Sequence, residues 1–143
     1  MIRTVVPVVL VFVLAVIGVL HFVWAVTPWP WRDKIAFTKA IYGSDSGELP
    51  PPPLSALVGA ALLGSAVLTL MVSDAIPGIG PDWLQFTGMV GLALVMLGRG
   101  AGGYFMNAGR AAEFRRWNSV LYSPLCLGLF LLATVVAVSA TAR

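Results

Sequence analysis

The sequence has few charged residues and only one cysteine. Asp, Glu, Lys and Arg make up 10% of its 143 residues, whereas soluble domains average about 25%. Apolar residues make up 59%, so too few polar side chains are available to cover a folded surface in water. The natural solvent of such a chain is a lipid bilayer. The single cysteine, Cys126, excludes an intrachain disulfide, a paired-thiol redox centre and a CxxC zinc motif.

Runs of basic residues and clusters of metal-binding side chains are absent too. The net charge is +3, but no stretch of Lys and Arg is long enough to follow a phosphate backbone, so no nucleic-acid partner is expected. The one histidine, His21, cannot form a bis-histidine haem site, and we do not favour a pair with Met96 or Met106. No glycine-rich phosphate loop follows a predicted strand. We therefore expect neither a metal nor a cofactor.

Four apolar stretches reach the length of a membrane span. About 20 helical residues cross the ~30 Å hydrocarbon core, and none of the stretches contains Asp, Glu or Lys. Because lipid offers the backbone no hydrogen-bond partners, we predict an all-α membrane protein, a four-transmembrane-helix bundle in a single domain, 1–143. The first stretch exceeds the ~7–15 apolar residues of a cleaved signal, so it should be retained. The predicted spans are residues 5–26, 54–73, 83–105 and 120–140.

Basic residues are divided unevenly between the two ends of the predicted bundle. Arg3 and Arg143 lie at one end, and the other seven Lys and Arg residues lie at the opposite end. Cytoplasmic loops are enriched in Lys and Arg. Loops one and three are therefore predicted to be cytoplasmic, and both termini extracytoplasmic. The seven residues are Arg32, Lys34, Lys39, Arg99, Arg110, Arg115 and Arg116.

Loop one, residues 27–53, combines a helical pattern with a proline-rich segment. In WRDKIAFTKAIYG, the residues Trp31, Ile35, Thr38 and Tyr42 recur at helical spacing, and Gly43 is a suitable C-terminal stop. We predict a short interfacial helix with these four side chains on one face, and an irregular loop is the alternative. The following GSDSGELPPPP should be exposed and non-helical.

Small residues form rows on two of the predicted spans. Ala56, Ala60 and Gly64 recur every four residues in the second span, and Gly98 and Gly102 form a GxxxG pair in the third. Such rows let helix backbones approach closely in membranes. We predict helix–helix contacts along both rows. The alternative is that they reflect only the general abundance of Gly and Ala in membrane helices.

Most polar and aromatic side chains gather at the end formed by loops one and three. His21 and Arg99 lie at similar depths in spans one and three, which run parallel. Ionisable groups at such depths are costly and indicate function, so we predict that both line one polar pocket. Asn118 and Tyr122, at i and i+4, could share a helix face near the start of span four. The candidate ligand- or lipid-binding residues are His21, Trp24, Arg99, Asn107, Arg110, Arg116, Trp117, Asn118 and Tyr122.

The same residues also have purely structural explanations. Trp and Tyr form belts at the membrane interface, Arg99 can extend to the headgroups, and Arg116 can simply fix the topology. Cys126 lies inside span four and is expected to be reduced and poorly reactive. Ser123 followed by Pro124 is typical of an N-cap with proline at the first helical position, although a helix start near Ser119 fits equally well.

Three segments carry distinctive combinations of residues: HFVWA at 21–25, GRGAGGYFMNAG at 98–109 and RRWNSVLYSPLCL at 115–127. Together they resemble a bacterial family of uncharacterised four-span membrane proteins, a domain of unknown function. YSPLCL is the most specific element, and the likeness extends from the first span through the fourth. The resemblance implies four helices and a location in the bacterial inner membrane. It implies no activity and assigns no catalytic residue.

These observations favour a non-enzymatic accessory or binding protein. Its site, at the cytoplasmic face, would hold a lipid headgroup, an amphiphile, or a partner membrane subunit or second copy of the chain. The first alternative is a membrane enzyme acting on a lipophilic substrate at the same face, with His21 as acid or base and Arg99 as an anion anchor. A small transporter is a further alternative, and the lack of carboxylates within the spans argues against it.

Overall fold

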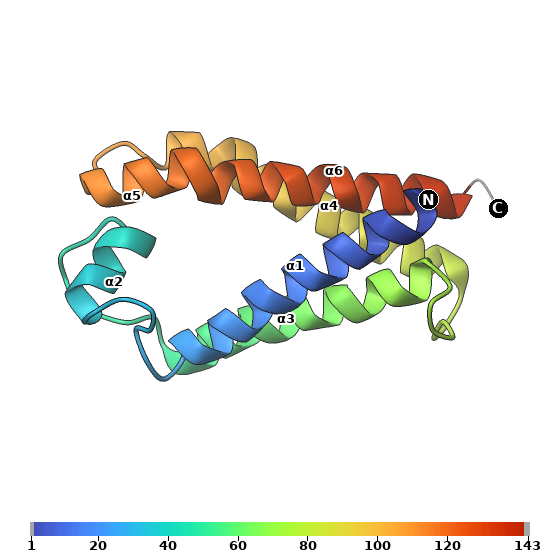
Figure 1. The fold of residues 1–143 in the computed structure, drawn as a ribbon, viewed down its shortest axis with the longest axis horizontal. Coiled ribbons are helices and arrows are strands. Elements are labelled where there is room, and N and C mark those ends of the chain that lie inside the picture. Colours follow the sequence, from blue (N-terminus) through green and yellow to red (C-terminus); the bar gives the residue numbers. More distant parts are fainter. Residues whose placement is uncertain (1, 142–143) are drawn as a thin grey trace.

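The computed structural model describes residues 2–141, and its long helices run between the two ends of an elongated bundle (Figure 1). Four helical segments are long and apolar enough to cross a membrane. This confirms the predicted all-helical membrane bundle. The segments are α1 (Ile2–Trp24), α3 (Pro52–Val72), α4 (Asp82–Phe105) and a continuous helix made of α5 (Ala112–Trp117), η1 (Asn118–Tyr122) and α6 (Ser123–Thr141).

Local sequence explains where the spans begin. Prolines occupy the first positions of α3, where the missing N–H has no intrahelical partner in any case. Asp82 lies in the first turn of α4, where a negative charge complements the positive end of the helix dipole. The predicted boundaries of the first three spans agree with the structure to within three residues.

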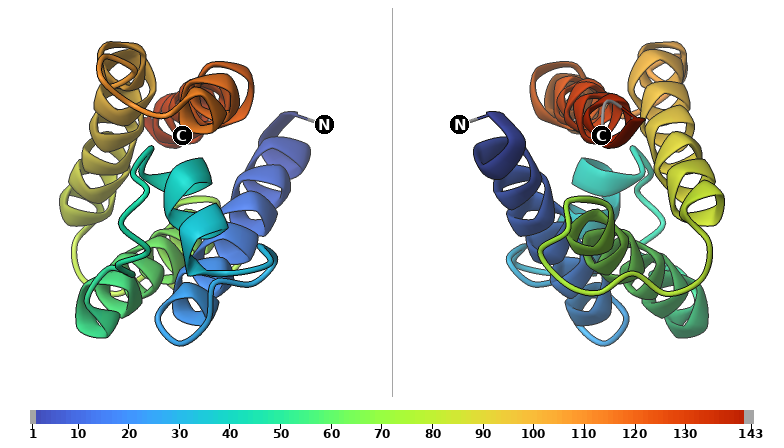
Figure 2. Two further views of the ribbon diagram at one scale, coloured as in Figure 1. Left: turned by 90° about the vertical axis from the view of Figure 1, so that its left-hand side faces the viewer. Right: turned by 90° about the vertical axis from the view of Figure 1, so that its right-hand side faces the viewer.

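The four spans are arranged as two pairs. α1 packs most extensively on α3, and α4 on α6. Contacts of α1 with α6 and of α3 with α4 join the pairs, so that α1 and α4 lie diagonally across the bundle (Figure 2). The core between them is apolar and includes Leu10, Leu14, Met89 and Ala133, which are all buried.

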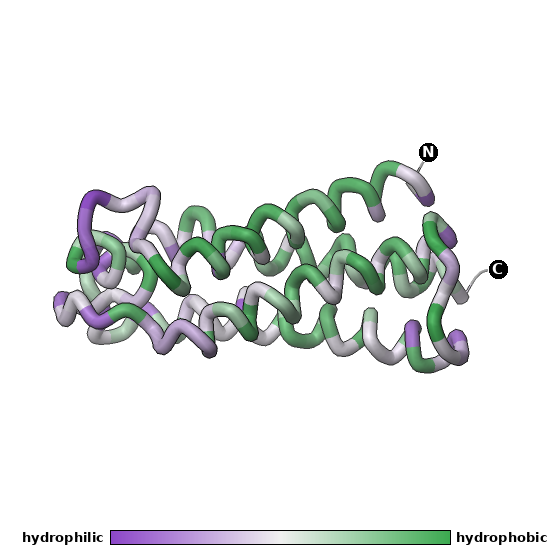
Figure 3. The backbone as a smooth tube through the Cα atoms, turned by 90° about the horizontal axis from the view of Figure 1, so that it is seen from below, coloured by the Kyte–Doolittle hydropathy of each residue, from purple (hydrophilic) through white to green (hydrophobic). Residues whose placement is uncertain are grey.

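The outer surface of the spans is apolar along most of its length. Only 22% to 33% of each span is buried inside the bundle, so most apolar side chains are available to lipid. Figure 3 shows hydrophobic residues along the long helices and hydrophilic residues concentrated towards the end formed by loops one and three. The two chain termini lie at the opposite end (Figure 1).

The predicted contact row on α3 is wrong by one position. A Cβ atom on Gly64 would meet nothing within 4 Å, and Ala60 is exposed. The close approach occurs instead at Gly59, where a Cβ would lie 2.8 Å from the Gly18 carbonyl oxygen of α1. The buried face of α3 thus includes Ser55 and Gly59 rather than the predicted row.

The GxxxG pair of α4 is also misplaced as a contact row. Cβ atoms on Gly98 or Gly102 would meet nothing within 4 Å. Gly100 and Gly103 face α6 instead, and a Cβ on Gly100 would lie 2.8 Å from the side chain of Leu127. Both small-residue motifs are present in the sequence. However, α3 and α4 are oriented about their axes so that Gly59, Gly100 and Gly103 contact the neighbouring helices instead.

Loop one contains the predicted short helix, α2 (Lys34–Ile41). The Asp33 carboxylate accepts a hydrogen bond of 2.8 Å from the Ala36 N–H and caps the N-terminus. Gly43, at φ +69°, follows the C-terminus in the left-handed conformation. The helix packs on α5 and lies between α5 and the α1/α3 pair (Figures 1 and 2).

The buried face of α2 differs from the predicted one. Phe37, Thr38 and Ala40 are buried, whereas Ile35 is 52% exposed and Tyr42 is 39% exposed. Of the predicted face, only Thr38 is fully buried. The reason is that α2 packs against α5, so the side that carries Phe37 is buried.

The last span begins earlier than predicted. The helix starts at Ala112, and a π-helical turn over Asn118–Tyr122 connects α5 to α6. In this turn the Ser123 N–H donates to the Asn118 carbonyl, five residues earlier. Pro124 lacks an N–H and would crowd a regular helix at the preceding turn, which the wider π turn accommodates. Ser123 therefore does not act as an N-cap, because it lies inside a continuous helix.

Candidate functional site

Asn118 is the centre of a buried polar network at the π turn. Its side-chain oxygen accepts hydrogen bonds of 3.1 Å from both terminal nitrogens of Arg99, and one of 3.3 Å from Ser123 Oγ. Its side-chain nitrogen donates to the Gly103 carbonyl and, over 3.0 Å, to Asn107 Oδ1. Asn118 and Ser123 are both fully buried. We call these five residues, together with Ser119, the Arg99–Asn118 cluster.

The wider geometry of the π turn explains how the cluster is assembled. A regular α-helix has 3.6 residues per turn. The extra residue of a π turn changes the direction in which the side chains before it point, relative to those after it. Asn118 thereby points at α4, while Ser119 contacts the end of that helix through a 3.0 Å hydrogen bond from Asn107 Nδ2. Arg99, Gly103 and Asn107 come from successive turns of α4 and its end, and therefore form one polar stripe.

Gly103 is required by the close packing within the cluster. A Cβ on Gly103 would lie no more than 2.5 Å from Ser123 Oγ and from Arg99 Nη1. Sequence reasoning missed Gly103, Ser119 and Ser123 as members of the cluster. GxxxG spacing drew attention to Gly102 instead, and no local signal separates these neighbouring glycines.

Arg99 brings a positive charge into the membrane-spanning part of the bundle. Its side chain is half-buried, and both hydrogen bonds described for it end on the neutral amide of Asn118. A guanidinium has five N–H donors and is always charged. The Arg99–Asn118 cluster thus combines a fixed positive charge with neutral hydrogen-bonding groups, an arrangement suited to an anion.

Hydrogen bonds from the last span and from the loop residues just before it hold α2 in place. Tyr122 Oη donates to the Ala40 carbonyl over 3.1 Å, and an Arg110 Nη1–H donates to the Tyr42 carbonyl over 2.8 Å. The Ala111 N–H donates to the Gly43 carbonyl over 3.0 Å. The C-terminus of α2 is therefore fastened to the segment that leads into the π turn.

His21 belongs to a different set of contacts. Its Nδ1 is 2.8 Å from the Ile17 carbonyl and must carry the proton, because a carbonyl only accepts. Its own carbonyl accepts a 2.6 Å hydrogen bond from Ser55 Oγ. Its ring lies 4.9 Å from that of Trp24, which also contacts Trp31 and leads into the aromatic side chains of loop one.

The structure does not join His21 to Arg99. The contacts of His21 come from α1 and α3, whereas those of Arg99 come from the π turn, and α1 and α4 are diagonal in the bundle (Figure 2). The predicted pocket shared by the two residues is therefore replaced by two separate environments.

The remaining candidate residues fall into two groups. Asn107 is in the Arg99–Asn118 cluster, while Tyr122 and Arg110 join α2 to the last span. Trp24 Nε1 donates to the Trp29 carbonyl over 2.9 Å and belongs to the aromatic group of loop one. Arg116 and Trp117 are exposed and face outward at the start of the last span.

Comparisons with known proteins identify the family. No curated protein and no solved structure matches the chain. A family described as "Protein of unknown function (DUF3995)" matches residues 14–133, a region that includes all of the Arg99–Asn118 cluster and His21. This confirms the resemblance to an uncharacterised family: the chain belongs to the DUF3995 family of proteins of unknown function.

Proposed function

We propose that this membrane protein is a non-enzymatic binding protein of the bacterial inner membrane, and that the Arg99–Asn118 cluster holds the anionic headgroup of an amphiphile. Loops one and three lie in the cytoplasm in this proposal, in accordance with the distribution of Lys and Arg. The observation that carries the proposal is the half-buried Arg99 guanidinium, whose hydrogen bonds end on a neutral amide.

Energetics favour an anion at this position. An arginine in the middle of a span costs roughly 2.5–3.5 kcal/mol on insertion scales, and less towards the interface. An amide oxygen satisfies two N–H groups without neutralising the charge. A phosphate or carboxylate from the cytoplasmic leaflet would supply that neutralisation through charge-assisted hydrogen bonds, which are stronger than neutral ones.

The contacts of His21 favour binding over catalysis. The enzyme alternative places His21 and Arg99 on the same substrate, as acid or base and as anion anchor. His21 Nδ1 instead donates to a carbonyl of its own helix, and its ring contacts that of Trp24 at a tilt of 54°. The two residues thus lack the common set of contacts that such a mechanism needs.

The Asn118→Asp variant tests the proposal. It is nearly isosteric and gives Arg99 a carboxylate partner within the protein, which would compete with a bound anion. Because it also removes the two hydrogen bonds that Asn118 Nδ2 donates, thermal unfolding of the variant verifies that the fold is kept. Native mass spectrometry of the purified protein, given equal amounts of phosphatidylglycerol and phosphatidylcholine, should show preferential retention of phosphatidylglycerol. We expect Asn118→Asp to lower that retention roughly tenfold, or ~1.4 kcal/mol.

Arg116→Gln is the matched control, because it removes an exposed cation from the same end of the molecule. It should change retention by less than about twofold. Equal retention of phosphatidylglycerol by the wild type, Asn118→Asp and Arg99→Gln would refute the proposal. Copurification of a stoichiometric protein instead of lipid would support a partner subunit at this face.

A further inference from the structure

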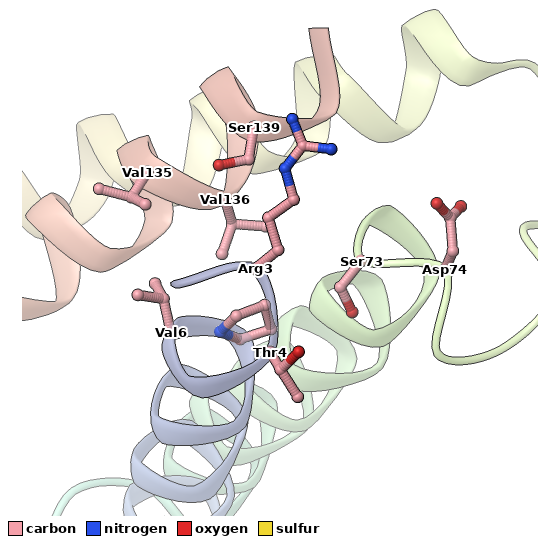
Figure 4. A pocket seen from close by; sticks show the side chains of 9 residues that line it. Arg3, Thr4, Val6, Ser73, Asp74, Val135, Val136 and Ser139 are labelled. Carbon is pink, nitrogen blue, oxygen red and sulfur yellow. The ribbon is translucent and has the colours of Figure 1, made fainter. Parts of the chain in front are cut away.

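A cavity of about 290 Å³ opens at the end of the bundle that carries the chain termini (Figure 4). It lies between the start of α1, the end of α3 and the C-terminal part of α6. Its polar lining includes Arg3 from α1, Asp74 from the turn after α3, and Ser139 from α6. This end is opposite the Arg99–Asn118 cluster, so the cavity is independent of the proposed site.

The cavity is lined by one positively charged and one negatively charged side chain. Figure 4 shows the Arg3 guanidinium and the Asp74 carboxylate extending to the same side from neighbouring helix ends. The helix dipoles reinforce this pattern, because Arg3 lies in the first turn of α1 and Asp74 follows the last turn of α3. Helix N-termini favour anions and helix C-termini favour cations.

The deeper lining is apolar. Val6 and Val136 continue the cavity along α1 and α6 towards the hydrocarbon part of the bundle. Arg3 and Asp74 lie at the ends of spans, which is the level of lipid headgroups. An occupant with a zwitterionic head and an apolar tail matches both parts of this lining.

We propose that this cavity binds a phospholipid headgroup that carries a phosphodiester and a primary ammonium. The phosphate lies against Arg3, with Ser139 as a hydroxyl donor, and the ammonium lies against Asp74. A primary ammonium can donate three hydrogen bonds, whereas a quaternary ammonium donates none. The site therefore distinguishes phosphatidylethanolamine from phosphatidylcholine.

The experiment measures lipid retention by native mass spectrometry of the full-length protein. Phosphatidylethanolamine, phosphatidylcholine and phosphatidylglycerol with identical acyl chains are supplied in equal amounts. We expect phosphatidylethanolamine to be retained several-fold more than phosphatidylcholine. Arg3→Gln and Asp74→Asn should each lower phosphatidylethanolamine retention roughly tenfold, since each removes one charge-assisted contact.

The variants were chosen so that folding is preserved. Asp74 has φ +59°, in the left-handed region that Asn also tolerates, so Asp74→Asn changes the charge without straining the turn. Arg32→Gln, in loop one at the other end, is the control for loss of one exposed cation and should leave retention unchanged. Thermal unfolding of each variant verifies the fold.

Three outcomes would overturn the proposal. One is equal retention of phosphatidylethanolamine and phosphatidylcholine, and another is insensitivity to both Arg3→Gln and Asp74→Asn. The third is full displacement of the lipid by soluble glycerophosphoethanolamine at equal concentration, which would identify a free headgroup compound as the ligand. Arg99→Gln tests the proposed function through phosphatidylglycerol retention, whereas Arg3→Gln and Asp74→Asn test this proposal through phosphatidylethanolamine retention, so the two can fail independently.

Discussion

Among the described residues at the polar end of the bundle, Asn118 makes the most side-chain hydrogen bonds. It is fully buried, and its amide bonds to groups on α4 and α6 at the same time. These bonds satisfy both ends of the buried Asn118 amide, and an unsatisfied buried polar group costs about 1–3 kcal/mol. The side chain therefore links the packing of α4 on α6 to the position of the Arg99 charge.

At the residue scale, we predict opposite effects of alanine at two adjacent glycines. Gly103→Ala should destabilise the protein by about 1–3 kcal/mol, because its Cβ would overlap Ser123 and Arg99. Gly102→Ala is the matched control. It should be neutral or stabilise the helix by up to ~1 kcal/mol, because nothing lies within 4 Å of its Cβ.

Thermal unfolding in detergent would measure both variants. Loss of phosphatidylglycerol retention in Gly103→Ala, but not in Gly102→Ala, would further connect this packing to the proposed ligand. An equal loss of stability in both variants would contradict the assigned rotation of α4.

At the scale of elements, the pairing of α1 with α3 depends on one point of close backbone approach. Gly18 and Gly59 face each other there, and each accommodates the other's carbonyl. Ser55 adds a hydrogen bond from α3 to the His21 carbonyl one turn away. Small residues at a crossing permit backbone contact, which is a main source of association between helices in lipid.

We predict that Gly59→Ala separates these helices and lowers the free energy of unfolding by about 1–3 kcal/mol. The Cβ would lie 2.8 Å from a backbone oxygen, which cannot move aside as a flexible side chain can. Gly64→Ala, on the same helix but without neighbours within 4 Å, should be neutral or mildly stabilising. A larger loss for Gly64→Ala than for Gly59→Ala would restore the original prediction that the row ending at Gly64 forms the contact.

At the scale of the whole molecule, two helix pairs create two separate polar environments. The hydrogen-bond partners of His21 lie in α1 and α3, whereas the partner of Arg99 lies in the π turn that leads into α6. Because they share no partner, we predict that the effects of His21→Ala and Arg99→Ala on unfolding free energy add to within about 0.5 kcal/mol. A double variant that deviates by more than about 1 kcal/mol would indicate a common ligand or pocket.

The orientation in the membrane is testable on intact cells. In a Cys126→Ser background, cysteines would be placed at Ser46 in loop one and at Ile79 in the loop between α3 and α4, both of which are exposed. We expect an impermeant thiol reagent to label Ile79→Cys from outside and Ser46→Cys only after lysis. The reverse pattern would show that loops one and three are extracytoplasmic.

The sequence alone determined the number of spans and the approximate bounds of the first three, whereas the helix of the last span begins at Ala112 rather than near residue 120. In lipid, the backbone of such long apolar runs can only be helical or part of a closed barrel. Composition and run length were therefore sufficient to predict the spans. Residue spacing and Gly43 likewise predicted α2, because a C-terminal stop acts within one turn of the helix, whereas the Asp33 cap was found only in the structure.

Only the tertiary structure decided which faces meet. The spans are apolar nearly all round, so hydrophobic periodicity carries little information about their rotation. Gly59 and Gly103 contact neighbouring helices while Gly64 and Gly102 do not, although all four occur in glycine- and alanine-rich sequence. Pro124 favours a wider turn near Ser123, but the contact of Asn118 with Arg99 depends on the packing of this turn against α4 and could not be predicted from the local residues. Rotation and register are set by contacts between residues distant in sequence, and these same contacts create the Arg99–Asn118 cluster.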